Sequence, residues 1–236
     1  MPREQMSEKK VAAYLNIDLR EIQKLASRGQ IPCRRVGGEF IFTKVEVDHW
    51  AFERFGKMDR HDLAGLEKGV SSHHGHEHEQ LLLSPLIPED GLAVPLDART
   101  GDAALRKLVE LGEKVGMVYV PGEVLDELRQ REQLCSTALM PGVAMPHPRH
   151  PLPYDIAESF VLVGLTHSGI PYGAEDGSLT RLFFMICCKD EKTHLHVLAR
   201  LARMLHEDQA VDRFISAEHP DQLRQMLLEC EESLLN

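Results

Sequence analysis

The sequence predicts two modules: a small N-terminal winged helix-turn-helix and a larger α/β domain, in which a mixed sheet is sandwiched by helices. Two short helical patterns and a hairpin pattern occupy residues 1–56. A histidine-rich stretch without apolar periodicity covers residues 57–87, and near-continuous apolar runs alternate with helical patterns over residues 88–236. Strands that are apolar throughout are buried on both faces, which favours a sheet covered by helices on two sides.

The first module is defined by capping and turn residues. Ser7 is placed to cap a helix over residues 7–15, Asp18 to cap a second over 19–28, and Gly29 to end it. Strand-like runs at 31–36 and 39–42 flank Gly37-Gly38, a pair typical of a tight hairpin turn. A last helix is expected over residues 44–55.

This segment resembles the excisionase/MerR-type DNA-binding module. The resemblance implies that the second helix enters the major groove and that the hairpin, with its Gly37-Gly38 turn, contacts phosphates. The residues assigned to DNA are Arg20, Gln23, Lys24 and Arg28 from the helix, and Arg34 and Arg35 from the hairpin.

A module of this kind can also serve as a protein-docking or dimerisation domain. Residues 1–55 hold ten Lys/Arg and eight Asp/Glu, so this segment has a net charge of +2. The whole chain has a net charge of −10, so the remaining residues carry −12. A module with so small an excess of positive charge can make only a few phosphate contacts, and it would bind DNA weakly as a monomer. Specific DNA binding would therefore need a homodimer or a partner.

Residues 57–87 are predicted to be a flexible linker. Four histidines and two glutamates between residues 73 and 79 could hold Zn²⁺ or Ni²⁺, and a metal-sensing protein is the function that this reading would give. The favoured interpretation is a solvated linker without a metal site, because no secondary structure fixes a tetrahedral set of ligands there. No cofactor is expected.

The larger module shows a regular succession of elements. Strands are expected at 92–96, 143–145, 159–166 and 179–187, and helices at 102–114, 121–133, 192–205, 209–216 and 220–231. Pro121 fits the first position of its helix.

The most informative stretch is GVAMPHP, residues 142–148. Proline fixes its own φ and drives the preceding residue towards extended geometry, so His147 should lie at the end of a strand with its ring presented outward. A neutral imidazole is nucleophilic, which makes His147 a candidate phosphoryl or acyl acceptor. The same seven residues also fit a histidine in a surface loop.

Further motifs accompany His147 in a fixed order. Arg131-Glu132 and Ser136-Thr137 precede it, and His194-Leu195 opens an amphipathic helix after it. In order and spacing this set resembles the type-2 enzyme IIA domains of the bacterial phosphoenolpyruvate sugar phosphotransferase system, in their fructose, mannitol and nitrogen-regulatory branches. The resemblance covers roughly residues 88–232.

The resemblance implies a role for each matched residue. His147 would accept a phosphoryl group from an HPr-like phosphocarrier protein, Arg131 would chelate its oxygens, and His194 and Thr137 would hydrogen-bond it. From the residues alone, Arg131 could instead be a helix-surface charge that pairs with Glu127, and His194 could be a helix cap.

The chain departs from the family pattern at two positions. Pro148 stands where the family usually has glycine, and Thr137 is followed by Ala138 where the family often has glycine. Proline removes an N–H that could have faced the phosphate.

These patterns favour a cytoplasmic regulatory phosphoacceptor, in which the phosphorylation state of His147 is linked to DNA or to a partner protein. The alternatives are a transport component that passes phosphate to a IIB cysteine, and a non-catalytic DNA-binding or scaffold protein. Five scattered cysteines without CxxC spacing are typical of free thiols in a reducing compartment. The sequence has no apolar run near the length of a membrane span.

Overall fold

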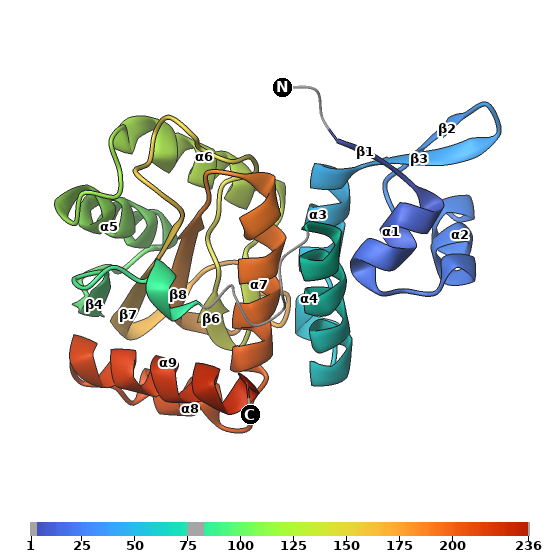
Figure 1. Cartoon of the computed structure of the whole chain (residues 1–236). Coiled ribbons are helices and arrows are strands. Elements are labelled where there is room, and N and C mark those ends of the chain that lie inside the picture. Colours follow the sequence, from blue (N-terminus) through green and yellow to red (C-terminus); the bar gives the residue numbers. More distant parts are fainter. Residues whose placement is uncertain (1–3, 75–82, 236) are drawn as a thin grey trace.

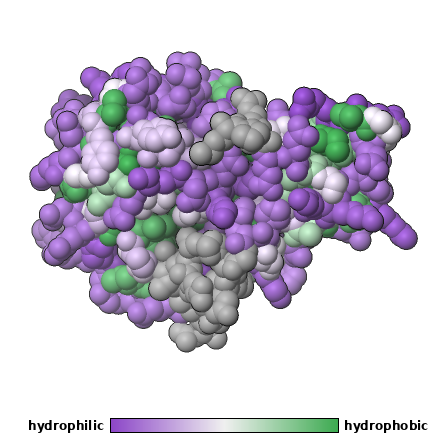
Figure 2. Space-filling view, turned by 45° about the horizontal axis from the view of Figure 1, so that its top comes forward, coloured by the Kyte–Doolittle hydropathy of each residue, from purple (hydrophilic) through white to green (hydrophobic). Residues whose placement is uncertain are grey.

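The computed structural model describes residues 4–74 and 83–235. Figure 1 shows a larger α/β unit and a smaller N-terminal head. Helix α3 of the head and helix α4 lie on the side of the head that adjoins the larger unit. The face in Figure 2 is mostly hydrophilic, with hydrophobic residues in small scattered groups. In the part of the chain that the structure describes, no helix is both long enough and apolar enough to cross a membrane.

The head is a winged helix-turn-helix with one more strand than expected. Its elements are β1 (Gln5–Ser7), α1 (Glu8–Leu15), α2 (Leu19–Ser27), β2 (Arg34–Val36), β3 (Glu39–Thr43) and α3 (Lys44–Phe52), and its antiparallel sheet has the order β1-β3-β2.

The predicted caps and turn of the head are present. The Ser7 side chain accepts a hydrogen bond from the backbone N–H of Lys10, and that of Asp18 from Arg20. Gly37 (φ 58°) and Gly38 (φ 93°) make the turn between β2 and β3. A tight two-residue hairpin turn requires positive φ at two successive residues, and glycine adopts positive φ at little cost.

The structure differs from the predicted flexible linker. After η1 (Phe55–Lys57), residues within the expected linker form the 15-residue helix α4 (Arg60–His74), and η2 (Ser84–Leu86) follows. The apolar side chains Leu63, Leu66 and Val70 are buried at spacings of three and four residues, which give one helical face. His73 and His74 end α4, and the remaining residues of the histidine-rich stretch, 75–82, lie outside the described residues.

The larger unit contains a five-stranded mixed sheet of order β4-β7-β8-β6-β5. β4 runs parallel to β7 and β6 parallel to β8, whereas β7–β8 and β5–β6 are antiparallel. The elements are β4 (Leu92–Leu96), α5 (Gly101–Lys114), α6 (Pro121–Leu134), β5 (Ala138–Met140), β6 (Gly142–Ala144), β7 (Phe160–Pro171), β8 (Leu179–Cys187), α7 (Glu191–Leu205), α8 (Ala210–Ile215) and α9 (Pro220–Leu235).

Alternation along β7 and β8 divides the core into two layers. Leu162 and Phe183 pack with residues of α5 and α6, whereas Val161 and Phe184 pack with residues of α7, α8 and α9. Successive side chains of a strand point to opposite faces, so the continuous apolar runs follow from burial on both. The predicted α/β class and mixed sheet are confirmed.

The head and the larger unit share the second of these core layers. Tyr14 and Phe42 of the head belong to the same contiguous cluster as Leu66 of α4 and Leu198 of α7. A Cβ added at Gly69 would lie 2.5 Å from the Tyr14 carbonyl oxygen, so α4 approaches α1 very closely. The two modules are therefore packed together through α4.

A buried ionic cluster holds α4 against α7. Glu67, fully buried on α4, is ion-paired with Arg200 and lies 3.0 Å from Arg203 Nη1. Arg200 Nη1 also lies 3.6 Å from Glu231 Oε1 on α9. Buried charges are tolerated only when they are paired, so Glu67 fixes where α4 can lie.

We predict that Glu67→Ala lowers the free energy of unfolding by about 3 kcal/mol, because it removes the carboxylate that pairs with the buried Arg200. Urea unfolding followed by circular dichroism measures this change. Glu110→Ala is the matched control: it removes an exposed partner of Lys107, and its effect should stay within about 0.5 kcal/mol. Equal effects of the two variants would contradict a stabilising role for the cluster.

Candidate functional site

His147 lies just beyond β6, on a segment anchored on both sides. The Met145 N–H donates to the Thr137 carbonyl (2.9 Å), and the Ile186 N–H of β8 donates to the Pro146 carbonyl (2.9 Å). His147 Nδ1 is 2.7 Å from the Met145 carbonyl oxygen. A carbonyl only accepts, so Nδ1 carries the proton, and the lone pair of the neutral ring is on Nε2.

The ring of His147 is not presented outward, as the sequence suggested. The residue is 1% exposed, and Nε2 is enclosed without a hydrogen-bond partner. Burial, with further contributions from the charges of Arg131 and His194, holds the pKa of His147 well below its usual range. The imidazole is therefore neutral at physiological pH, which is the form with a nucleophilic nitrogen.

His194 lies in the first turn of α7, beside His147. The two ring centroids are 5.2 Å apart, and His194 Nε2 is also enclosed without a partner. Burial, followed by the positive charge of Lys44, lowers the pKa of His194 to about 3. The helix is capped by Asp190, so His194 does not serve as the cap. His196 instead faces α4, where its Nδ1 is 2.9 Å from Ser71 Oγ.

Arg131 reaches this site from α6. Its side chain is buried, and Nη1 donates to the Cys135 carbonyl (2.7 Å), while Nε and Nη2 are enclosed without partners. The alternative of a helix-surface charge beside Glu127 does not describe this position. A guanidinium with two unused donors is suited to binding an oxyanion in bidentate fashion.

Thr137 has a different place from the one expected. Its hydroxyl donates to Glu132 Oε2 (2.5 Å), and its backbone N–H to the same carboxylate (3.1 Å). Its carbonyl accepts from Met145, two residues before His147. Thr137 and Glu132 therefore hold the histidine segment in place, and the Thr137 hydroxyl is already engaged. The neighbouring Ser136 hydroxyl donates to the Tyr172 carbonyl (2.6 Å).

One wall of the site comes from the head, which the sequence analysis did not anticipate. The Phe52 ring of α3 makes an edge contact with the His147 ring, at 4.6 Å between centroids and 71° between planes. The Arg131 guanidinium lies 5.6 Å from the centroid of the same Phe52 ring. Nε2 of His49, also on α3, is enclosed without a partner, and burial together with the charges of Arg131 and Arg149 lowers the pKa of His49 to about 4.

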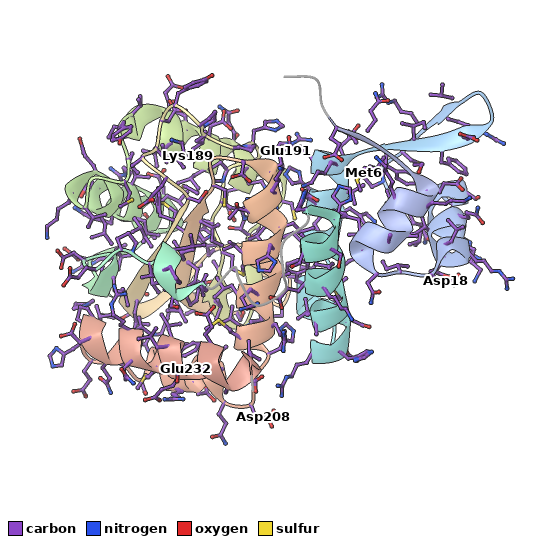
Figure 3. All side chains as sticks on the ribbon, in the orientation of Figure 1. Met6, Asp18, Lys189, Glu191, Asp208 and Glu232 are labelled. Carbon is purple, nitrogen blue, oxygen red and sulfur yellow. The ribbon has the colours of Figure 1, made fainter. Side chains whose placement is uncertain are left out.

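A buried lysine fixes the other end of α3. Lys44 Nζ donates to Asp48 Oδ2 (2.7 Å) within α3 and to the carbonyl of Glu191 (2.9 Å) at the start of α7. Figure 3 shows Glu191 at the end of α7 that adjoins the head. No local signal predicts the contact of Lys44 with Glu191, because it joins residues 147 positions apart.

The residues assigned to DNA lie on another side of the head. Arg20, Gln23, Lys24, Arg28, Arg34 and Arg35 are all exposed. In Figure 1, α2 and the β2–β3 hairpin point away from the larger unit. Gln23 Nε2 donates to Glu8 (2.9 Å), and Lys24 lies 3.2 Å from Glu21, so two of the six already contact acidic neighbours.

Metal-ligating side chains are not gathered in the described ranges 4–74 and 83–235, where no group of three or more His, Cys, Asp or Glu could hold an ion. The five cysteines are free.

We predict that acid destabilises the fold through these histidines. The folded-state pKa of His194, about 3, lies below its unfolded value near 6.5, so the unfolded chain binds the extra proton and stability falls as the pH drops below about 6.5. From pH 7 to pH 5 this amounts to about 2 kcal/mol, which His194→Gln should remove from the pH dependence of urea unfolding. His167→Gln, which replaces an exposed histidine, should keep the full loss. A pH dependence that is the same in both variants would contradict the assignment.

Comparison with known proteins agrees with this fold. Residues 86–230 match the family model "Phosphoenolpyruvate-dependent sugar phosphotransferase system, EIIA 2", and residues 6–54 match a helix-turn-helix domain model. The mannitol-specific phosphotransferase enzyme IIA component of Staphylococcus aureus is 27% identical over 154 residues, covering 63% of this chain and 99% of that protein.

Two further relatives differ in how much of them the chain spans. The PTS system mannitol-specific EIICBA component of Vibrio cholerae is 25% identical over 134 residues, which is 55% of this chain and only 20% of that protein. The crystal structure of nitrogen regulatory protein IIA-Ntr from Neisseria meningitidis has the same fold, with a TM-score of 0.56 and 22% identity over 62% of this chain and 99% of that one. Because the matched model covers more than half of the sequence, the chain belongs to the EIIA type 2 family of the phosphoenolpyruvate-dependent sugar phosphotransferase system.

Proposed function

We propose that His147 accepts a phosphoryl group from an HPr-like phosphohistidine carrier in the cytoplasm, and that the chain has a regulatory role. The observation that carries the proposal is the neutral His147 with its lone pair on Nε2, placed beside Arg131 and His194. Nε and Nη2 of Arg131 and Nε2 of His194 are enclosed without partners. Membership of the EIIA type 2 family supports the same chemistry.

The transfer follows from the state of the ring. The Nε2 lone pair of His147 attacks phosphorus, and the phosphorus–nitrogen bond of the donor phosphohistidine breaks, so that its electron pair returns to the donor imidazole. The proton stays on Nδ1, which donates it in a hydrogen bond to the Met145 carbonyl, and no other proton has to move when the donor ring also carries a proton on its second nitrogen. Arg131 stabilises the charge on the transferred oxygens, which is the main electrostatic demand of phosphoryl transfer.

A regulatory role is favoured over sugar transport by what accompanies the EIIA domain. In this chain the domain shares a core with a helix-turn-helix head, and Phe52 of that head touches His147. The EIICBA relative of Vibrio cholerae is named as a mannitol component, and transfer to a IIB cysteine is the alternative for this chain. A phosphorylated histidine adds about −1.5 to −2 charges, which is enough to alter packing at a domain contact.

DNA is the output that the head suggests, with a second copy of the chain as a further partner. The exposed face of α2 and the β2–β3 hairpin present the six assigned residues to solvent. A few cationic contacts to phosphates give weak binding that depends strongly on salt.

We predict that the wild-type protein becomes labelled from phosphoenolpyruvate through enzyme I and the carrier, and that His147→Ala abolishes the label. Arg131→Lys should slow labelling about 100-fold, because one ammonium replaces a bidentate guanidinium. The measurement is the rate at which acid-labile radioactive phosphate is incorporated. His167→Ala, at an exposed position, is the matched control and should be labelled like the wild type. A folded wild type without label would favour the non-catalytic scaffold.

We predict that replacing Arg34 and Arg35 together by Ala weakens binding to mixed-sequence duplex DNA and lowers the slope of log affinity against log salt by about 2, one for each lost phosphate contact. Fluorescence anisotropy over a range of salt concentrations measures both. Replacing the exposed Arg106 of α5 by Ala should change neither quantity. An unchanged salt slope in the double variant would argue that the head docks proteins and not DNA.

A further inference from the structure

The head covers the nucleophile of the EIIA domain. Phe52, 3% exposed, lies on the His147 ring, and no exposed surface remains at His147 Nε2. Transfer requires a donor to approach this nitrogen in line and the new phosphoryl group to occupy the space beyond it. In the described arrangement, Phe52 of α3 packs against this ring, and Nε2 is enclosed.

We propose that α3 of the head is a cap on the phosphoacceptor site, and that capping and phosphorylation of His147 exclude each other. This regulation rests on the proposed function of His147. A segment of the same chain, Lys44–Phe52, thus occupies the surface on which a donor protein has to bind.

The chemistry of the cap fits the unphosphorylated ring only. A neutral imidazole packs well against the edge of a phenyl ring, whereas a phosphoryl group beneath Phe52 would lose water and gain an apolar neighbour. The cationic groups that face the site from the EIIA domain, Arg131 above all, can pair with phosphate oxygens once Phe52 has moved away.

The contacts of the cap differ in kind from those that hold the adjoining helix. The contacts of α3 with the EIIA domain include that of the Phe52 ring with His147 and the hydrogen bond from Lys44 to the Glu191 carbonyl. Helix α4 is held by the buried pairs of Glu67 with Arg200 and Arg203. Weakening the cap at Phe52 therefore leaves these buried pairs intact.

Mutual exclusion has a reciprocal consequence. If docking of the head lowers the affinity of His147 for a phosphoryl group by some factor, phosphorylation of His147 lowers the equilibrium constant for docking of the head by the same factor. The phosphorylated chain is thus the form with a released α3.

The test uses diethyl pyrocarbonate, which acylates neutral imidazole nitrogens without any phosphotransferase protein. The rate at which the peptide containing His147 is modified is followed by mass spectrometry in the full-length chain. We expect Phe52→Ala to raise this rate at least about 10-fold, since it exposes Nε2, and Phe52→Leu to raise it less. Phe40→Ala is the matched control: it removes the same side chain from the wing, where Phe40 contacts Arg35, and should leave the rate unchanged. Exposed His167 is the internal reference in every sample.

The wild type supplies a test that needs no variant. Modification of His147 must be much slower than that of His167, and equal rates would overturn the cap even if Phe52→Ala failed to fold. An unchanged rate at His147 in folded Phe52→Ala would overturn it as well. The same variants are then labelled from phosphoenolpyruvate, where Phe52→Ala should accept phosphate about 10-fold faster than the wild type. Faster acylation without any labelling would retain the cap and reject the phosphoacceptor function.

Discussion

The position of α4 between the head and α7 is the constraint on which the rest of the structure depends. Its apolar residues join the cluster shared by both units, and Glu67 is ion-paired with Arg200 and Arg203 of α7. Displacing α4 would take the Glu67 carboxylate away from both guanidinium groups, which costs several kcal/mol. Because α1 packs closely on α4, the same interaction sets the orientation of the docked head and brings α3 onto the end of β6.

Burial gives His147 its chemical state and also limits access to it. The Met145 carbonyl holds the proton on Nδ1, and the enclosed surroundings keep the ring neutral, with its lone pair on Nε2. Part of this enclosure belongs to the EIIA domain, in Arg131 and His194, and part to Phe52 of the head. Only the second part can be removed by a movement of the head, so the site can open without losing the groups that would bind a phosphoryl group.

Local sequence patterns predicted most of the fold, whereas tertiary contacts between residues far apart in the sequence left no such pattern. Ser7, Asp18 and the Gly37-Gly38 turn act through neighbouring residues, and the sequence therefore places them correctly. The meeting of Arg131 and His194 with His147 was implied by the resemblance and is seen in the structure. The cap was not predicted, because its packing is decided by tertiary contacts. Helix α4 did leave a signal, the spacing of its buried leucines and valine, which the polar, histidine-rich composition obscured.

The head uses different faces for its contact with the EIIA domain and for the residues assigned to DNA. This restricts how phosphorylation of His147 could influence the proposed DNA binding. The α2 and hairpin face points away from the EIIA domain, while α3 lies on the side of the head next to that domain (Figure 1). A docked head therefore keeps its cationic face open, and the phosphoryl group does not compete with DNA for the same residues. Any coupling must instead act through the orientation of the head. In a dimer this orientation sets the spacing between two recognition helices, and half-site recognition depends on that spacing. Under the proposed function, release of α3 would then alter DNA binding without touching any of the residues assigned to DNA.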